Sequence, residues 1–483
     1  MKRFFMSLAG VLVLLLGVLV FNAVRFSAPS KPSAPSYAIA VAPDADELAQ
    51  QLSEAIQFQT LSQENGNADD NEAFNDFTAW LEHTYPKVFT TLSVQRFNQH
   101  TLLLHWQGTA STAPVLFSAH YDVVPVNPGT EQNWQHPPFA GTIADGMIWG
   151  RGALDDKGTV VALMASVNAL LAQNFTPTND IYIAFTHDEE LGSELGSQAV
   201  MTYFKENGIN LAWSLDEGSF VLRGIAPGVD KDIASINVTE KGFLNLKLTA
   251  SAAGGHSSMP PEDTAVTLLA NALVKLHNAP LPGSLEGVSK QMYSNIARHM
   301  DFPKRFLFAN MWLFKPLLNN FLASSPSGNA MLRTTTAPTM LSGSVKANVL
   351  PATATATVNF RLHPRDTIDD VIAWVKNAID DDRIKIEPLE AFEAANVAPS
   401  DTKGFADLSE AAGAIYSDTI ITPGITIAAT DSRFYSQITN AYRFTPMVIT
   451  LSDVDSIHGT NEKVSIDNMI NAVRFYSAVM QRQ

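Results

Sequence analysis

Acidic and imidazole side chains stand at the ends of several short apolar segments of this 483-residue chain. Such segments are typical of buried strands, and a charged group is almost never fully buried unless it is paired or binds a metal. Histidines and carboxylates offer the nitrogen and oxygen ligands of a hydrolytic metal centre. We therefore predict a hydrolase that uses two metal ions and draws on His120, Asp122, Asp155, Asp156, Glu189, Glu190, Asp216 and His458.

The segments between these residues predict the scaffold that brings them together. Helical patterns from Asp44 onward precede two apolar runs, APVLFSAHYD and IYIAFTHDEE, and the helix candidate GTVVALMASVNALLAQN lies between those runs. Strands that alternate with helices predict an α/β fold, a mostly parallel sheet flanked by helices. Ligands of such sheets gather at the carboxyl ends of the strands, where the acidic residues lie here.

A second unit interrupts the first near residue 236. Its predicted elements follow the order β-α-β-β-α-β, an α+β split βαβ sandwich, and the first unit resumes near Ala395 to supply His458. We predict a catalytic domain over 44–235 and 395–483, with an inserted lid or dimerisation domain over 236–394. The insert contains the apolar stretch Met300 to Ser325. One interpretation of this stretch is a helical pair packed on the domain. The other is an apolar surface that covers an apolar substrate or faces a membrane.

The N-terminus carries a location signal. Lys2 and Arg3 precede an apolar run from Phe4 to Val24, about the length that crosses a bilayer as a helix. We predict an uncleaved transmembrane anchor over 1–26, a Pro/Ser linker over 27–43, and an exported catalytic domain. Secretion after cleavage of a signal peptide is the alternative.

The net charge and the cysteine content exclude several kinds of partner and of functional site. The net charge is −16 and no Lys/Arg cluster is present, so we expect no nucleic-acid partner. The absence of cysteine excludes disulfides, thiolate metal ligands and a cysteine nucleophile.

Six motifs in order resemble the M20 family of dinuclear zinc peptidases, in its carboxypeptidase S-like and N-acyl-amino-acid hydrolase branch. The resemblance runs from about residue 45 to the end, through the motifs HYD (120–122), GRGALDDKG (150–158), DEELGS (188–193), LDEG (215–218), GGHSSMP (254–260) and HGTNEK (458–463).

The resemblance implies a role for each motif residue at the metal centre. Asp155 would bridge two zinc ions per subunit, with cobalt or manganese as possible substitutes. His120 and Asp216 would complete one site, and Glu190 and His458 the other. By reach alone, Glu217 could take the place of Asp216; the family position favours Asp216.

Two acidic residues would assist the metals. Glu189 resembles the family's general base. Asp122 follows His120 by two residues, so it is placed to accept the other ring N–H and orient the imidazole. The resemblance also implies a cis peptide between Asp155 and Asp156.

Further residues would face the substrate. His256 resembles the family histidine that hydrogen-bonds the oxyanion, often contributed by a partner subunit, so a homodimer through the inserted domain is expected. Asn348 and Arg361 match positions that grip the substrate, and Arg433 the position that takes its carboxylate. Ala428 and Ala429 depart from the family pattern, which has a pair of glycines there.

These observations predict a carboxypeptidase- or dipeptidase-type hydrolase that cleaves an amide bond, in a peptide or an N-acyl-amino acid, next to a free carboxylate. An N-fatty-acyl-amino-acid amidohydrolase is the alternative, motivated by the apolar stretch Met300 to Ser325. Arg361 and Arg433 argue against an aminopeptidase. A catalytically silent peptide-binding protein is a remote alternative, because the ligand set and Glu189 are all retained.

Overall fold

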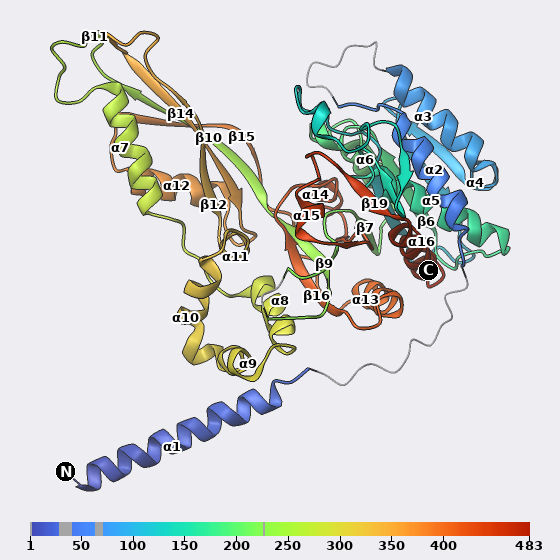
Figure 1. The fold of residues 1–483 in the computed structure, drawn as a ribbon, viewed down its shortest axis with the longest axis horizontal. Coiled ribbons are helices and arrows are strands. Elements are labelled where there is room, and N and C mark those ends of the chain that lie inside the picture. The colour runs from blue at the N-terminus through green and yellow to red at the C-terminus, as the bar shows by residue number, and fades with distance from the viewer. Residues whose placement is uncertain (1, 29–40, 63–70, 226–227) are drawn as a thin grey trace.

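A computed structural model describes residues 2–28, 41–62, 71–225 and 228–483. Figure 1 shows a large unit, a smaller elongated unit and a long N-terminal helix that lies apart from both sheets. The predicted linker over 27–43 falls mostly outside the described residues.

The large unit is built on a mixed sheet with a parallel centre. Its strand order is β1-β2-β6-β3-β7-β17-β9-β8-β18, and β16 pairs with β9. Strands β6, β3, β7 and β17 run parallel to one another, whereas β2 pairs antiparallel with both β1 and β6, and β9 pairs antiparallel with β17. The strands are β1 (Ser93–Phe97), β2 (Thr101–Trp106), β3 (Val115–His120), β6 (Ile181–Thr186), β7 (Trp213–Asp216), β8 (Val221–Leu222), β9 (Ile233–Glu240), β16 (Ile420–Thr426), β17 (Asn440–Arg443) and β18 (Val448–Ile449).

Helices cover both faces of this sheet, which confirms the predicted fold class. Side chains of a strand alternate between faces. In β3, Val115 and Phe117 therefore join one core and Leu116 joins another. The first core includes α2 (Ala45–Gln57), α3 (Asn71–Thr84), α4 (Pro86–Thr91), α5 (Lys157–Ala172), α13 (Lys403–Ile415) and α16 (Ile466–Met480). The second includes α6 (Ser197–Glu206) and α14 (Ser432–Tyr435).

A small antiparallel sheet supports the loop that carries His458. Its order is β19-β5-β4, with β4 (Thr142–Ala144), β5 (Met147–Trp149) and β19 (Lys463–Ser465). The loop begins after α15 (Leu451–Val454). Because β5 leads into the turn with Asp155 and β19 follows His458, the pairing of these two strands brings the two motifs together.

The inserted unit is an antiparallel sheet covered by two helices. Its order β12-β14-β10-β15 and the chain order β-α-β-β-α-β match the prediction. Alternate side chains of β10 are buried under the helices. The elements are β10 (Gly242–Ser251), α7 (Ala265–Asn278), β12 (Thr335–Ser342), β14 (Thr353–Leu362), α12 (Ile368–Ile379) and β15 (Ile384–Phe392); β11 (Gly255–His256) pairs with β13 (Val349–Leu350) at the tip.

The chain passes between the units at Lys241, not at residue 236 as predicted. Strand β9 pairs with β16 in the large sheet, and β10 begins at Gly242. The sequence alternates apolar and polar residues through both strands, so it does not indicate where β9 ends and β10 begins. The outgoing and returning chains lie close here: a Cβ on Gly242 would stand 2.5 Å from the backbone nitrogen of Ala394.

Four helices join α7 to β12: α8 (Gly287–Ala297), α9 (Phe302–Ala309), α10 (Met311–Ala323) and α11 (Pro326–Leu332). The stretch Met300 to Ser325 is therefore mainly a helical pair, as one of the two interpretations had it. The pair packs around a core of its own, formed by Leu285, Ala297, Phe308, Leu318, Leu322 and Leu332. Within the described residues, α1 (Lys2–Arg25) is the one helix long and apolar enough to cross a membrane.

Candidate metal centre and substrate cleft

Four of the five predicted metal ligands meet beside the carboxyl ends of β3 and β6. His120 ends β3, Glu190 lies in the turn after β6, Asp155 precedes α5, and His458 comes from the loop before β19. The Nε2 atom of His120 lies 2.8 Å from Oδ1 of Asp155. The Nε2 atom of His458 lies 3.1 Å from Oδ2 of Asp155 and 3.0 Å from Oε1 of Glu190. Asp155 therefore stands between the two histidines and presents one oxygen to each.

This arrangement fits a metal centre. One potential ligand atom each from His120, Asp155 and Glu190 lies within 4.8 Å of the others, so one ion can reach all three. A carboxylate with an imidazole on each oxygen is the geometry expected of a ligand shared by two ions. Imidazole nitrogens and carboxylate oxygens without thiolates suit hydrolytic zinc.

Asp216, the fifth predicted ligand, is not among the three residues whose potential ligand atoms group together. It ends β7 and is buried, and its Oδ2 has no hydrogen-bond partner among the described residues. Burial first, and then the charge of Asp431, raises its pKa to about 7. Burial also raises the pKa of the neighbouring Glu217, and there the next contributions come from Asp155 and Asp156.

Asp122 connects His120 to the turn that carries Glu189 and Glu190. The Nδ1 atom of His120 lies 3.0 Å from the backbone oxygen of Asp122 and 3.3 Å from its Oδ1. The same carboxylate accepts the backbone N–H groups of Glu189 at 3.2 Å and Glu190 at 3.1 Å, and the hydroxyl of Ser62. Burial alone would raise the pKa of Asp122, but the hydrogen bonds from His120 and Ser62 lower it below its usual range.

Glu189 lies beside this cluster, in the turn Glu189–Leu191. Burial raises its pKa well above the usual range; His120 opposes that effect and Glu190 adds to it. The peptide bond between Asp155 and Asp156 is cis, as the sequence predicted.

A buried ion pair that the sequence analysis missed joins the two motifs around Asp155 and His458. Oε2 of Glu462 accepts a hydrogen bond from Nη1 of Arg151 at 2.7 Å. Oε1 accepts the backbone N–H of Leu154 at 2.9 Å and that of Asp155 at 3.2 Å. Nη2 of Arg151 donates to the backbone oxygen of Gly459 at 2.8 Å. Both residues lie in motifs that the sequence analysis singled out, Arg151 in GRGALDDKG and Glu462 in HGTNEK.

Arg433 and Arg361 flank a pair of stacked rings where the two units meet. The guanidinium of Arg433 lies 4.5 Å from the ring centroid of Phe392, and that of Arg361 lies 4.9 Å from Phe243. The two rings stack with centroids 5.5 Å apart. Arg433 also donates a hydrogen bond to the backbone oxygen of Gly192, two residues beyond Glu190.

A cleft of about 520 Å³ opens beside Arg433. Its lining comes from the turn after Glu190, from the end of β15 and from α14, and includes Gly192, Glu194, Gln198, Phe392 and Arg433. The cleft therefore lies between the large unit and the inserted unit, and it holds one of the predicted substrate-binding arginines.

His256 and Asn348 are not brought to this centre within one chain. Both are exposed at the tip of the inserted unit, where the backbone N–H of Ser257 donates to the oxygen of Asn348 at 3.2 Å. Figure 1 shows β11 at the end of the inserted unit farthest from its junction with the large unit.

Comparison with known proteins shows the family and the fold. The family model described as "Peptidase family M20/M25/M40" matches residues 116–482. A probable carboxypeptidase S-like 2 of Dictyostelium discoideum is 41% identical over 437 residues, which cover 89% of this chain and 84% of that protein. The N-fatty-acyl-amino acid synthase/hydrolase PM20D1 of Mus musculus is 38% identical over 438 residues, which cover 89% of this chain and 86% of that protein.

Two solved structures share the fold. The M20 family metallo-carboxypeptidase Sso-CP2 from Sulfolobus solfataricus gives a TM-score of 0.65 at 19% identity, over 90% of this chain and 99% of that one. Human carnosine dipeptidase 1 gives a TM-score of 0.64 at 16% identity, over 91% of this chain and 96% of that one.

Proposed function

The chain belongs to peptidase family M20/M25/M40 and is a metal-dependent hydrolase, as its motifs predicted, and we propose that it cleaves an amide bond next to a free carboxylate. The observation that carries this proposal is the placement of Asp155 between His120 and His458, next to a cleft that holds Arg433.

We assign two zinc ions to His120, Asp155, Glu190, Asp216 and His458. Asp155 would be the shared ligand, and Oδ2 of Asp216, which is buried without a hydrogen-bond partner among the described residues, would complete the set together with His120. Glu217 is the alternative at that position. When bound, the ions would polarise the scissile carbonyl and make a water molecule acidic enough to be deprotonated.

Glu189 is the proposed general base. It removes a proton from the attacking water, whose oxygen forms a bond to the carbonyl carbon, and the carbon–nitrogen bond then breaks as Glu189 delivers the proton to the leaving nitrogen. Asp122 holds the imidazole of His120 in orientation through Nδ1. His256 would hydrogen-bond the oxyanion from a second copy of the chain.

The substrate's carboxylate is proposed to pair with Arg433, because a guanidinium can bind a carboxylate through two parallel hydrogen bonds. We propose that the rest of the substrate contacts Arg361, which lies over the stacked ring of Phe243, and Asn348, at the tip of the inserted unit.

An N-fatty-acyl-amino acid is the second candidate substrate. Relatives at 38% identity carry the name N-fatty-acyl-amino acid synthase/hydrolase, and the inserted unit of this chain contains exposed apolar side chains on α9 and α10. Turnover of long-chain N-acyl-amino acids should be compared with that of N-acetyl-amino acids and dipeptides. Preference for short polar dipeptides would exclude the lipid substrate.

Substitution of Glu189 by Gln tests the proposed mechanism. Glu189→Gln should keep its metal content, because Glu189 is not an assigned ligand, while kcat falls by about 10²–10⁴-fold. Glu206→Gln, at the exposed end of α6, is the matched control and should leave kcat unchanged. Near-normal turnover by Glu189→Gln would show that another group is the base.

We propose that α1 is an uncleaved anchor and that the hydrolase domain lies on the exported side. Basic residues ahead of an apolar helix of mean hydropathy 2.8 support this topology. Removal of α1 as a signal peptide is the alternative, and N-terminal sequencing of the mature protein distinguishes the two.

A further inference from the structure

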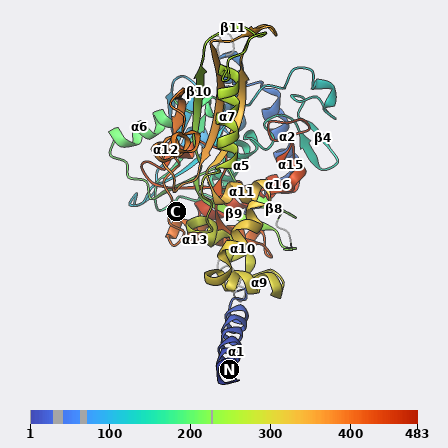
Figure 2. The same ribbon diagram turned by 90° about the vertical axis from the view of Figure 1, so that its left-hand side faces the viewer.

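The last turns of α1 are bonded to the inserted helices. Nδ2 of Asn310, the buried residue between α9 and α10, donates to the backbone oxygen of Leu19 at 3.0 Å. Its Oδ1 accepts from Nδ2 of Asn22 at 2.9 Å. Leu19 and Ala23 are buried, although the rest of α1 is mostly exposed. Figures 1 and 2 both show α9 lying beside the C-terminal end of α1.

These contacts set the depth of α9 and α10 relative to the proposed membrane span. At 1.5 Å per residue, Leu19 lies about 9 Å along the helix from Arg25, where the apolar stretch ends. An interfacial helix buries its apolar face about 5–10 Å into the headgroup and acyl boundary. If α1 spans the bilayer, α9 and α10 are therefore held at the depth of that boundary.

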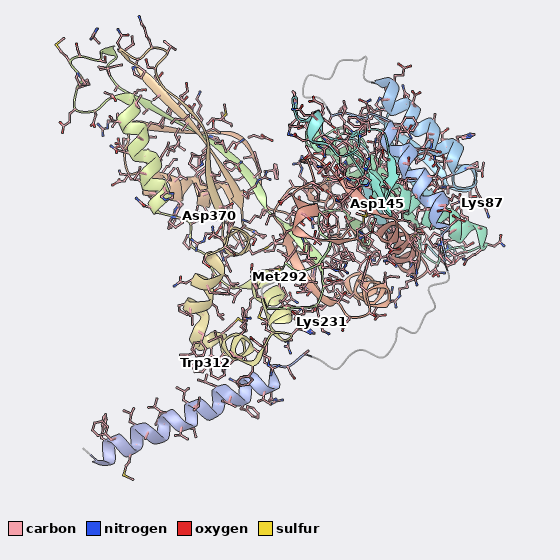
Figure 3. The ribbon with its side chains drawn as sticks, in the orientation of Figure 1. Lys87, Asp145, Lys231, Met292, Trp312 and Asp370 are labelled. Atoms are coloured by element: carbon pink, nitrogen blue, oxygen red, sulfur yellow. The ribbon has the colours of Figure 1, made fainter. Side chains whose placement is uncertain are left out.

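Helix α10 presents an exposed apolar stripe. Leu313, Leu317 and Phe321 are spaced by four residues, so they share one face, and they are 42%, 55% and 60% exposed. The adjacent row of Phe314, Leu318 and Leu322 faces the helical core instead. Trp312, at the start of α10, is 64% exposed and lies near α1 in Figure 3.

The charge of this region differs from that of the whole chain. Residues 298–325 hold four basic side chains against one acid, a net charge of +3 in a protein of net −16. Arg298 lies 4.6 Å over the ring of Phe26, just beyond the end of α1. Basic side chains attract anionic lipid headgroups, and tryptophan is enriched at the membrane interface.

We propose that α9 and α10 lie in the membrane interface, with the stripe Leu313, Leu317 and Phe321 in contact with lipid, as a second attachment beside α1. The proposal rests on the proposed anchoring by α1. Two attachments would restrict the orientation of the hydrolase unit relative to the membrane more than a single span would.

The absence of cysteine from the chain allows a direct test. Single cysteines at Leu317 and Phe321 would be labelled with an environment-sensitive fluorophore in the full-length protein. The protein would be reconstituted into vesicles of zwitterionic and anionic phospholipid that contain a spin-labelled quencher lipid. Val13→Cys in α1 reports on anchoring, and Thr90→Cys on α4, at the far side of the large unit, is the aqueous control.

We expect lipid-borne quenching at positions 13, 317 and 321, and quenching by aqueous iodide alone at position 90. Quenching at 13 without quenching at 317 and 321 would overturn the interfacial proposal and leave the anchor in place. Lack of quenching at 13 would refute the anchoring proposal and the interfacial one with it. Hydrolysis of a soluble substrate by each labelled protein checks that it is folded.

Discussion

Arg151 and Glu462 stabilise the proposed metal centre from outside its ligand set. They are separated by 311 positions in the sequence, yet together they bind the backbone at Asp155 and at Gly459, next to His458. Both side chains are almost completely buried, so each charge depends on the other for compensation. The pair thus aligns the turn of the shared ligand with the loop of the second histidine.

Loss of this pair should weaken metal binding more than it weakens catalysis. In Glu462→Gln the guanidinium of Arg151 loses its ionic partner and both backbone segments are held less firmly. We expect metal affinity to fall by about 10–100-fold, the range seen when groups behind metal ligands are removed. Once saturated with metal, the variant should recover most of its kcat. Competition with a chelator measures the affinity, and unchanged affinity would show that the pair does not position the ligands.

The motifs singled out His120, Asp155, Glu190 and His458, and the fold brings these four side chains into contact; their role as metal ligands stays a prediction. The sequence was not sufficient for the choice between Asp216 and Glu217, since neighbours in a chain differ only in the direction of their side chains. The Arg151–Glu462 pair was missed although both residues lie in the motifs, because their contact depends on the pairing of β5 with β19.

At the scale of elements, the junction between the two units places the buried imidazole of His363 near two basic residues, Lys241 and Arg365. His363 follows β14, and its Nε2 lies 3.5 Å from Oγ of Ser289 on α8. Burial, and then the charges of Arg365 and Lys241, lower the pKa of His363 to about 3. The imidazole is therefore neutral in the folded protein at neutral pH.

Acid should destabilise this junction through His363. The unfolded chain binds a proton on this residue below pH 6.5, whereas the folded chain resists it down to about pH 3, so stability falls as the pH drops through that window. At pH 4.5 the loss from this one group is about 2–3 kcal/mol. His363→Gln is neutral at every pH and should show a smaller fall in Tm between pH 7 and pH 4.5 than the unsubstituted protein. An equal fall in Tm for the two proteins would show that His363 does not cause this pH dependence.

Local sequence patterns predicted the order of elements in the inserted unit but misplaced its first boundary. Alternation of apolar and polar residues runs from β9 into β10, although β9 is buried at every position and β10 at every second one. The division at Lys241 arises from tertiary pairing, since β9 joins β16 and β10 joins β14. The pattern of a strand indicates that it has a buried face, not which sheet it belongs to.

At the scale of the whole molecule, the position of His256 determines whether one chain forms a complete site. It is exposed at the tip of the inserted unit, and Glu189 lies in the large unit. A second copy with its inserted unit over the first copy's cleft would supply this histidine. A symmetric dimer would then contain two composite sites.

Two inactive variants should restore activity when they are combined. In a dimer of His256→Ala with Glu189→Gln, one composite site has both intact groups. Random pairing at equal amounts should therefore yield about a quarter of the normal activity. Coexpression of Glu189→Gln with Asp122→Ala is the control and should stay inactive, because both residues belong to the large unit. Absence of recovery in the first mixture would mean that His256 does not act across subunits.

Metal content is the most direct test of the dinuclear centre. The purified protein should hold two zinc ions per chain, and Asp155→Ala should lose both ions and its hydrolytic activity, because Asp155 is the shared ligand. Glu206→Gln should retain both ions. If Asp155→Ala keeps two tightly bound ions and normal turnover, the side chains that meet around Asp155 do not form the catalytic metal centre.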